Sequence, residues 1–158
     1  SYMFNIKPNR RGLIQLFLIS LGITTLINGI LFSFNINESV TQPIKPEYPL
    51  LPSSWMVGLI WTILIGFMTY TQWLLIKSTR NRTMLSLIPI LFLNCVLYPL
   101  YSQGFTNDFN QLIGNLFTIA FAAYITGRIR SITVAGSNLM LMVTLWGLFA
   151  TFATSKLI

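Results

Sequence analysis

Few side chains in this sequence could perform acid–base, nucleophilic or redox chemistry. The chain contains no histidine, which excludes catalysis of the Ser-His-Asp or Cys-His type. Its single cysteine, Cys95, excludes an internal disulfide and a CxxC metal site. No Asp or Glu lies within the long apolar runs, which excludes a carboxylate proton relay inside them. We therefore assign no catalytic residue and no metal ligand, and we expect no resident cofactor.

Aromatic rings, amides and small residues are the remaining candidates for ligand contact. A helix over 53–76 would present on one face Gly58, Trp61, Ile65, Met68 and Gln72. A helix over 132–155 would bring together Met142, Trp146 and Phe149, with Ala150 at the edge of that face. The run 84–105 contributes the amide of Asn94. Each has an alternative explanation: core packing for the tryptophans, helix–helix hydrogen bonding for the amide, and close helix approach for the small residues.

The composition predicts that membrane-spanning helices position these residues. The chain has 158 residues, of which 54% are hydrophobic and 8% charged, and its mean hydropathy is +0.69. Soluble domains carry about 25% charged residues, so these charges are too few to cover a water-facing surface. Five apolar runs fall within the range of about 17–25 residues that a bilayer span needs. They cover 12–34, 53–76, 84–105, 111–127 and 132–155. The sequence predicts an all-α integral membrane bundle of five transmembrane helices, forming a single domain over 1–158.

The charges lie between the apolar runs and predict an orientation. The net charge of +7 could suggest nucleic acid, but this placement indicates membrane topology instead, and we expect no nucleic-acid partner. If the segments between spans alternate sides, one side receives eight of the ten basic residues, and the other receives Lys45, Lys156 and all three acids. Because positive charge concentrates on cytoplasmic segments, we expect a multi-pass protein with a cytoplasmic N-terminus.

The connection over 35–52 is the longest between predicted spans and has a regular proline pattern. Proline occupies every third position at its end, at Pro43, Pro46, Pro49 and Pro52. Polyproline II has three residues per turn and rises about 3.1 Å per residue, so this stretch could cross the end of a small bundle. It could be a stiff connector or a lid over a cavity that opens on the second side. In the lid interpretation, the mouth of that cavity includes Lys45, Pro46 and Lys156.

Several segments resemble a known family of membrane proteins. They are Trp55-Met-Val-Gly58-Leu-Ile-Trp61-Thr62-Ile-Leu64 followed by Met68 and Trp73-Leu74, then Leu93-Asn94 with Pro99-Leu100, and Trp146-Gly-Leu-Phe149-Ala150-Thr151. This pattern resembles that of the TspO/MBR family, the tryptophan-rich sensory or translocator proteins. Lys45-Pro46 is similar to the opening of the family motif. The sequence departs from the pattern at Ile65 and Leu97, where the family has tyrosine and tryptophan, and at Met142-Val143, where it has Pro-Tyr.

The resemblance implies a receptor or translocator that binds a flat apolar ligand, such as a porphyrin or a sterol, in stress signalling. The implied ligand site comprises Gly58, Trp61, Asn94, Leu97, Trp146, Phe149 and Ala150. The partners implied are the lipid bilayer, the small-molecule ligand and a second copy of the chain in a homodimer. A bacterial cell membrane is favoured over an organelle membrane. Two alternatives stay open: an enzyme that degrades porphyrin, and a structural membrane subunit without a ligand.

Overall fold

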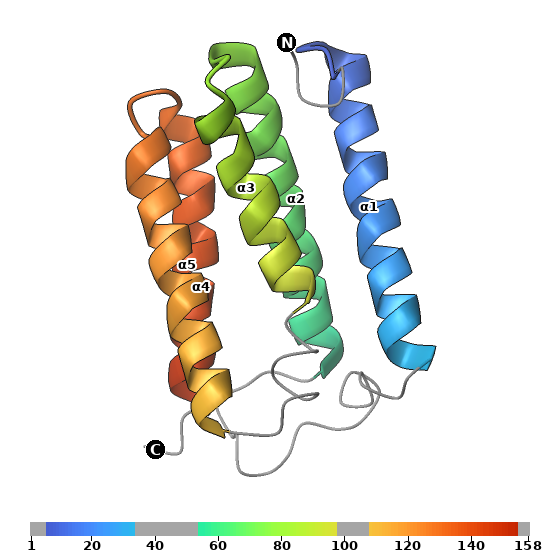
Figure 1. Cartoon of the computed structure of the whole chain (residues 1–158), viewed down its shortest axis with the longest axis vertical. Helices are drawn as coiled ribbons and strands as arrows, with labels where there is room; N and C mark the ends of the chain where they lie inside the picture. Colours follow the sequence, from blue (N-terminus) through green and yellow to red (C-terminus); the bar gives the residue numbers. More distant parts are fainter. Residues whose placement is uncertain (1–5, 34–53, 98–107, 155–158) are drawn as a thin grey trace.

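The computed structural model describes residues 6–33, 54–97 and 108–154, which form five helices and no strand. In chain order they are α1 (Arg10–Ser33), α2 (Ser54–Ser78), α3 (Arg82–Val96), α4 (Asp108–Ile129) and α5 (Val134–Thr154). Consecutive helices run in opposite directions along one long axis (Figure 1). Four of them are long and apolar enough to cross a membrane, and α3 is a shorter apolar helix. The prediction of an all-α bundle of five membrane helices is confirmed.

The predicted spans agree with α1, α2, α4 and α5 to within three residues at each end. The third span differs more, because α3 begins at Arg82 rather than at residue 84 and ends at Val96, while residues 98–105 lie outside the described part of the chain. The early start has a local cause. The side chain of Asn81 caps the helix by accepting hydrogen bonds from the backbone N–H groups of Thr83 (2.9 Å) and Met84 (3.4 Å). Hydropathy detects the apolar run but not the cap.

One end of the bundle collects the basic residues, and we call it the basic end. The start of α1, the turn 79–81 and the turn 130–133 all lie there (Figure 1). These segments and the adjoining helix turns carry Lys7, Arg10, Arg11, Lys77, Arg80, Arg82, Arg128 and Arg130. The predicted grouping of eight basic residues on one side therefore matches the arrangement of the helices.

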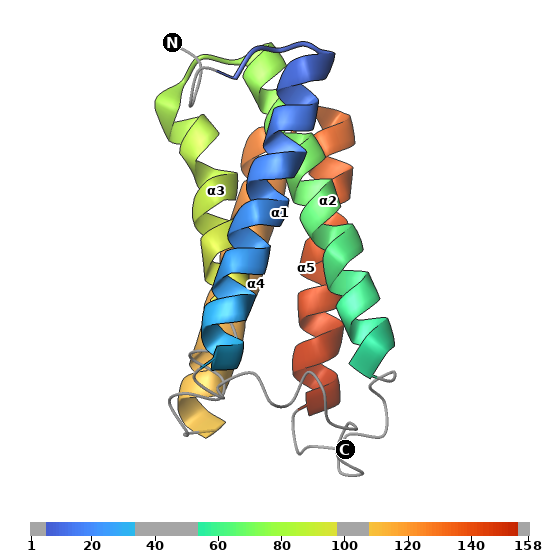
Figure 2. The same ribbon diagram turned by 90° about the vertical axis from the view of Figure 1, so that its right-hand side faces the viewer.

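α2 occupies the middle of the bundle and contacts α1, α3 and α5, while the most extensive pairing joins α4 and α5. Figure 2 shows α1 in front of this arrangement, beside both α2 and α3. Two glycines on α5 permit close approach. A Cβ added to Gly136 would lie 2.8 Å from Cγ2 of Thr71 on α2, and one added to Gly147 would lie 3.1 Å from Cγ1 of Ile119 on α4. Small residues thus set the α2–α5 and α4–α5 spacings.

Every pair of consecutive helices shares a side-chain hydrogen bond. These bonds join Ser20 to Thr69, Gln72 to the carbonyl of Leu85, Asn94 to Thr118, and Ser137 to the carbonyl of Thr126. Hydrogen bonds between membrane helices contribute on average about 0.6 kcal/mol each. They therefore fix the rotation of each helix relative to its neighbour more than they determine overall stability.

The tightest packing lies toward the basic end. The largest fully buried side chains are Ile6, Met68, Thr71, Leu75, Leu91, Ile125, Ile129, Ser137 and Met140. In the opposite half, the side chains described over 56–63 of α2, 112–121 of α4 and 145–152 of α5 are all partly buried or exposed. Only α3 continues its buried face to Val96, and Ala153 is buried near the end of α5. The described core is therefore dense at the basic end and loose at the other.

Candidate functional site

All seven residues predicted to contact a ligand lie in the loosely packed half of the bundle. Gly58 and Trp61 are near the beginning of α2, and Asn94 and Leu97 are at the end of α3. Trp146, Phe149 and Ala150 are in the last two turns or so of α5. Helix direction brings them to one end, because α2 begins where α3 and α5 finish (Figure 2). The predicted mouth residues Lys45, Pro46 and Lys156, and the whole loop 35–52, lie outside the described residues.

Trp61 and Trp146 come from two helices in direct contact, α2 and α5, and both are partly buried against the hydrophobic core. The ring of Trp146 lies 5.6 Å from the ring of Phe149, centroid to centroid, at an interplanar angle of 39°. Its indole Nε1 is buried and has no hydrogen-bond acceptor among the residues that the structure describes. A buried N–H group left unpaired costs about 1–3 kcal/mol. Trp146 therefore has an unused donor at the predicted site.

Trp73, near the basic end of α2, has a different environment. Its Nε1 donates to the backbone carbonyl of Asn9 at 3.0 Å, and the Nζ of Lys77 lies 4.4 Å from the centre of its ring. A tryptophan that packs near a helix end, pairs its N–H and contacts a cation is typical of the membrane interface. Trp73 thus has a paired N–H group at the basic end, whereas the N–H group of Trp146, in the other half of the bundle, has no partner among the described residues.

Asn94 connects two helices. Its Nδ2 donates to Oγ1 of Thr118 on α4, and that hydroxyl donates in turn to the carbonyl of Gly114 at 2.8 Å. Helix–helix hydrogen bonding, the alternative to ligand contact, therefore accounts for the Asn94 amide group. The neighbouring Cys95 is buried in the hydrophobic core. The Asn94 amide group thus holds the end of α3 against α4. The thiol of the adjacent Cys95 is buried.

The other predicted contacts are less enclosed. Leu97 and Phe149 are 37% and 41% exposed, which in a membrane means substantial contact with lipid or with a ligand at the surface of the bundle. Ala150 is partly buried. Gly58 is exposed, and a Cβ added there would meet no atom within 4 Å. Close helix approach therefore does not explain Gly58, whereas it does explain Gly136 and Gly147.

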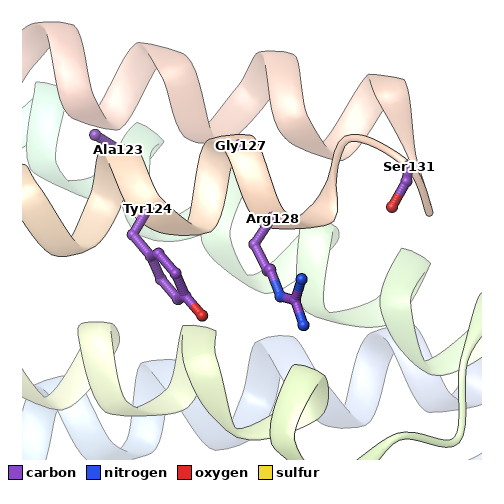
Figure 3. A pocket seen from close by; sticks show the side chains of 5 residues that line it. All are labelled: Ala123, Tyr124, Gly127, Arg128 and Ser131. Carbon is purple, nitrogen blue, oxygen red and sulfur yellow. The ribbon is translucent and has the colours of Figure 1, made fainter.

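A second feature, which the sequence analysis did not identify, lies at the basic end of α4. Ala123, Tyr124, Gly127, Arg128 and Ser131 line a shallow, open hollow. The side chains of Tyr124 and Arg128 point in the same direction, away from α5 and toward α3 (Figure 3). The available signal was the spacing of tyrosine and arginine by one helical turn at the end of an apolar run. This spacing alone does not indicate a site, because interfacial tyrosine and arginine are common in any membrane protein.

The helical bundle and its apolar spans define a multi-pass integral membrane protein, and two of its partly buried tryptophans, Trp61 and Trp146, lie in the half remote from the basic end. A sequence profile of the TspO/MBR family matches residues 14–158, which is nearly the whole chain. The chain therefore belongs to the TspO/MBR family, as its resemblance to the family pattern predicted. Searches among curated proteins and among solved structures return no match. Family membership supports a membrane protein of the receptor or translocator kind.

Proposed function

We propose that this protein binds a flat apolar ligand of the porphyrin class in the half of the bundle remote from the basic end. The observation that carries the proposal is the buried, unpaired Nε1 of Trp146 beside the ring of Phe149. Binding sites are mostly apolar and contain a few placed polar groups, which is the composition found here. A carbonyl, carboxylate or hydroxyl oxygen of a ligand would supply the acceptor that the described residues do not.

The packing supports the same location. Apart from Ala153, the buried side chains described in α2, α4 and α5 lie from Leu64, Ala122 and Thr144 toward the basic end, so the aromatic half could accommodate a rigid ring with less rearrangement. Trp61 and Trp146 would contact the ring faces, and Ala150 would leave space beside them. Aromatic contacts of this kind contribute about 0.5–1.5 kcal/mol beyond area burial.

The ligand would be held by stacking and shape rather than through a metal. Haem proteins commonly bind iron through histidine, cysteine or methionine, and this chain has no histidine. Cys95 is buried in the core on α3, so ligation by its thiol would require that helix to move. We therefore expect metal-free protoporphyrin and haem to bind with affinities within a fewfold of each other.

We also propose that the basic end faces the cytoplasm of a bacterial cell and that the ligand enters from the opposite side. The loop 35–52 would cover that opening, with Lys45 or Lys156 facing the ligand carboxylates. The distribution of basic residues supports this orientation. A role in sensing or transport follows from family membership together with binding.

Absorbance titration of the purified protein with protoporphyrin tests the proposal. Trp146→Phe keeps an aromatic ring but removes the N–H donor, and it should weaken binding about three- to tenfold, as expected for one hydrogen bond. Trp73→Phe is the matched control, because its N–H is already paired at the basic end, and it should leave the affinity unchanged.

Each alternative gives a different result in this experiment. Absence of saturable binding would indicate a structural subunit without a ligand. Breakdown products formed in light but not in darkness would indicate a porphyrin-degrading enzyme. Haem that binds a hundredfold more tightly than the metal-free ring, with a spectrum of axial ligation, would contradict the stacking account.

A further inference from the structure

The hollow beside α4 has the chemistry of an anion site and lies at the basic end of an apolar span, where lipid headgroups are expected. Arg128 is in the last turn of α4, which ends at Ile129, and Tyr124 is one turn earlier. Tyr124 is 54% exposed, and Arg128 and Ser131 are exposed as well. Both long side chains point toward α3, while Ser131 lies at the turn that follows α4 (Figure 3). The residues that carry one guanidinium and two hydroxyl groups thus line the same hollow.

The described charged residues around this hollow are all basic. Every basic residue of the described helices and turns belongs to the basic end, and the acids of the sequence are Glu38, Glu47 and Asp108. Asp108 begins α4, so at 1.5 Å per residue it is about 30 Å from Arg128 along the helix. No described acidic residue lies near Arg128. Its guanidinium, with five donors, is therefore available for an external anion.

The surface next to the hollow suggests the rest of the ligand. Phe117, Phe121, Tyr124 and Arg128 follow one another at helical spacing on one face of α4. The rings of Phe117 and Phe121 are stacked, with centroids 6.0 Å apart and planes 4° from parallel, and Phe117 is 57% exposed. This aromatic stripe runs from the hollow toward the middle of the membrane. An anionic head and an apolar tail would therefore meet matching surfaces at the same time.

We propose that this hollow binds an anionic glycerophospholipid. The guanidinium of Arg128 would bind the phosphate oxygens in the bidentate geometry that arginine favours, and the hydroxyls of Tyr124 and Ser131 would donate to the same group. An acyl chain would lie along Phe117 and Phe121, on the α3 side of α4. The lipid would act as a fixed component of the bundle at the basic end. The proposal does not depend on porphyrin binding.

Native mass spectrometry of the whole protein in detergent, titrated with phosphatidylglycerol or with phosphatidylcholine of the same acyl chains, tests the proposal. The first phosphatidylglycerol should bind about tenfold more tightly than phosphatidylcholine, and Arg128→Gln should remove that preference. Arg130→Gln is the matched control. It removes the same charge two residues away, at an exposed position that does not line the hollow, and it should change the first binding constant less than twofold.

Two further variants distinguish a specific lipid site from non-specific electrostatic attraction of anionic lipid to the basic end. Arg128→Lys keeps the charge but not the bidentate geometry, so it should retain only part of the preference. Tyr124→Phe should weaken phosphatidylglycerol binding a fewfold without altering the charge. This variant tests the site even if Arg128→Gln fails to fold. Equal effects of the Arg128 and Arg130 variants, or no preference for phosphatidylglycerol, would overturn the proposal. Displacement of the lipid by inorganic phosphate at constant ionic strength would show a phosphate site instead, and would also overturn it.

Discussion

Pro89 creates a local deficit in α3 that a residue of another helix fills. Proline has no backbone N–H, so the carbonyl of Leu85, four residues earlier, loses its intrahelical partner. Nε2 of Gln72 on α2 donates to that carbonyl at 2.8 Å. In a membrane no water is available to replace such a bond, and neighbouring helices commonly supply it. The buried amide group of Gln72 therefore replaces the hydrogen bond that Pro89 removes from α3.

This pairing predicts a coupling between two substitutions. Gln72→Leu should lower the free energy of unfolding in mixed micelles by about 1–2 kcal/mol. In a Pro89→Ala background the same change should cost less, because the N–H of the new alanine can bond to Leu85. A double-mutant cycle measured by detergent-induced unfolding gives the coupling directly. Strictly additive effects would mean that the Gln72 amide does not compensate for Pro89.

At the scale of helix packing, two glycines in different settings should respond differently to the same change. Gly136→Ala would place its Cβ 2.7 Å from Cγ2 of Thr133 and 2.8 Å from Cγ2 of Thr71. Threonine is restricted about χ1, so these methyl groups cannot move away freely, and the substitution should destabilise the α2–α5 contact by about 1–3 kcal/mol. Gly58→Ala meets no atom within 4 Å and should leave stability nearly unchanged. Thermal unfolding of the two variants in detergent checks this, and equal midpoints would contradict it.

The helices themselves were predictable because hydrocarbon imposes one strong rule, that long apolar runs without charge form spans. The five runs and the grouping of basic residues required only composition and order. The partners of each helix were not predictable in this way. The bond from Asn94 to Thr118 depends on which helices are adjacent, and neither residue type identifies its partner. Gly58 and Gly136 are likewise indistinguishable in sequence, although only Gly136 lies at a close helix contact.

The candidate site was likewise predictable only in part from the sequence. The family pattern brought Trp61, Trp146 and their neighbours to attention, and the helix directions place them in one half of the bundle. The unpaired donor of Trp146 and the pairing of Trp73 depend on three-dimensional surroundings, so two identical residue types could not be separated beforehand. The hollow at Arg128 was missed because the charge was explained fully by topology.

At the scale of the whole molecule, the arrangement of the helices makes the orientation testable. Eight basic residues gather at the end that contains the α2–α3 and α4–α5 turns (Figure 1), and the positive-inside rule predicts that this end is cytoplasmic. A cysteine introduced at the exposed Ser78 should therefore be protected from a membrane-impermeant maleimide in intact cells and labelled after permeabilisation. A cysteine at Glu38, on the predicted opposite side, should be labelled in intact cells. The unmodified chain is the control, because its only thiol, Cys95, is buried in the core and should not react. Labelling of Ser78→Cys but not of Glu38→Cys in intact cells would reverse the orientation, and with it the side from which the ligand is proposed to enter.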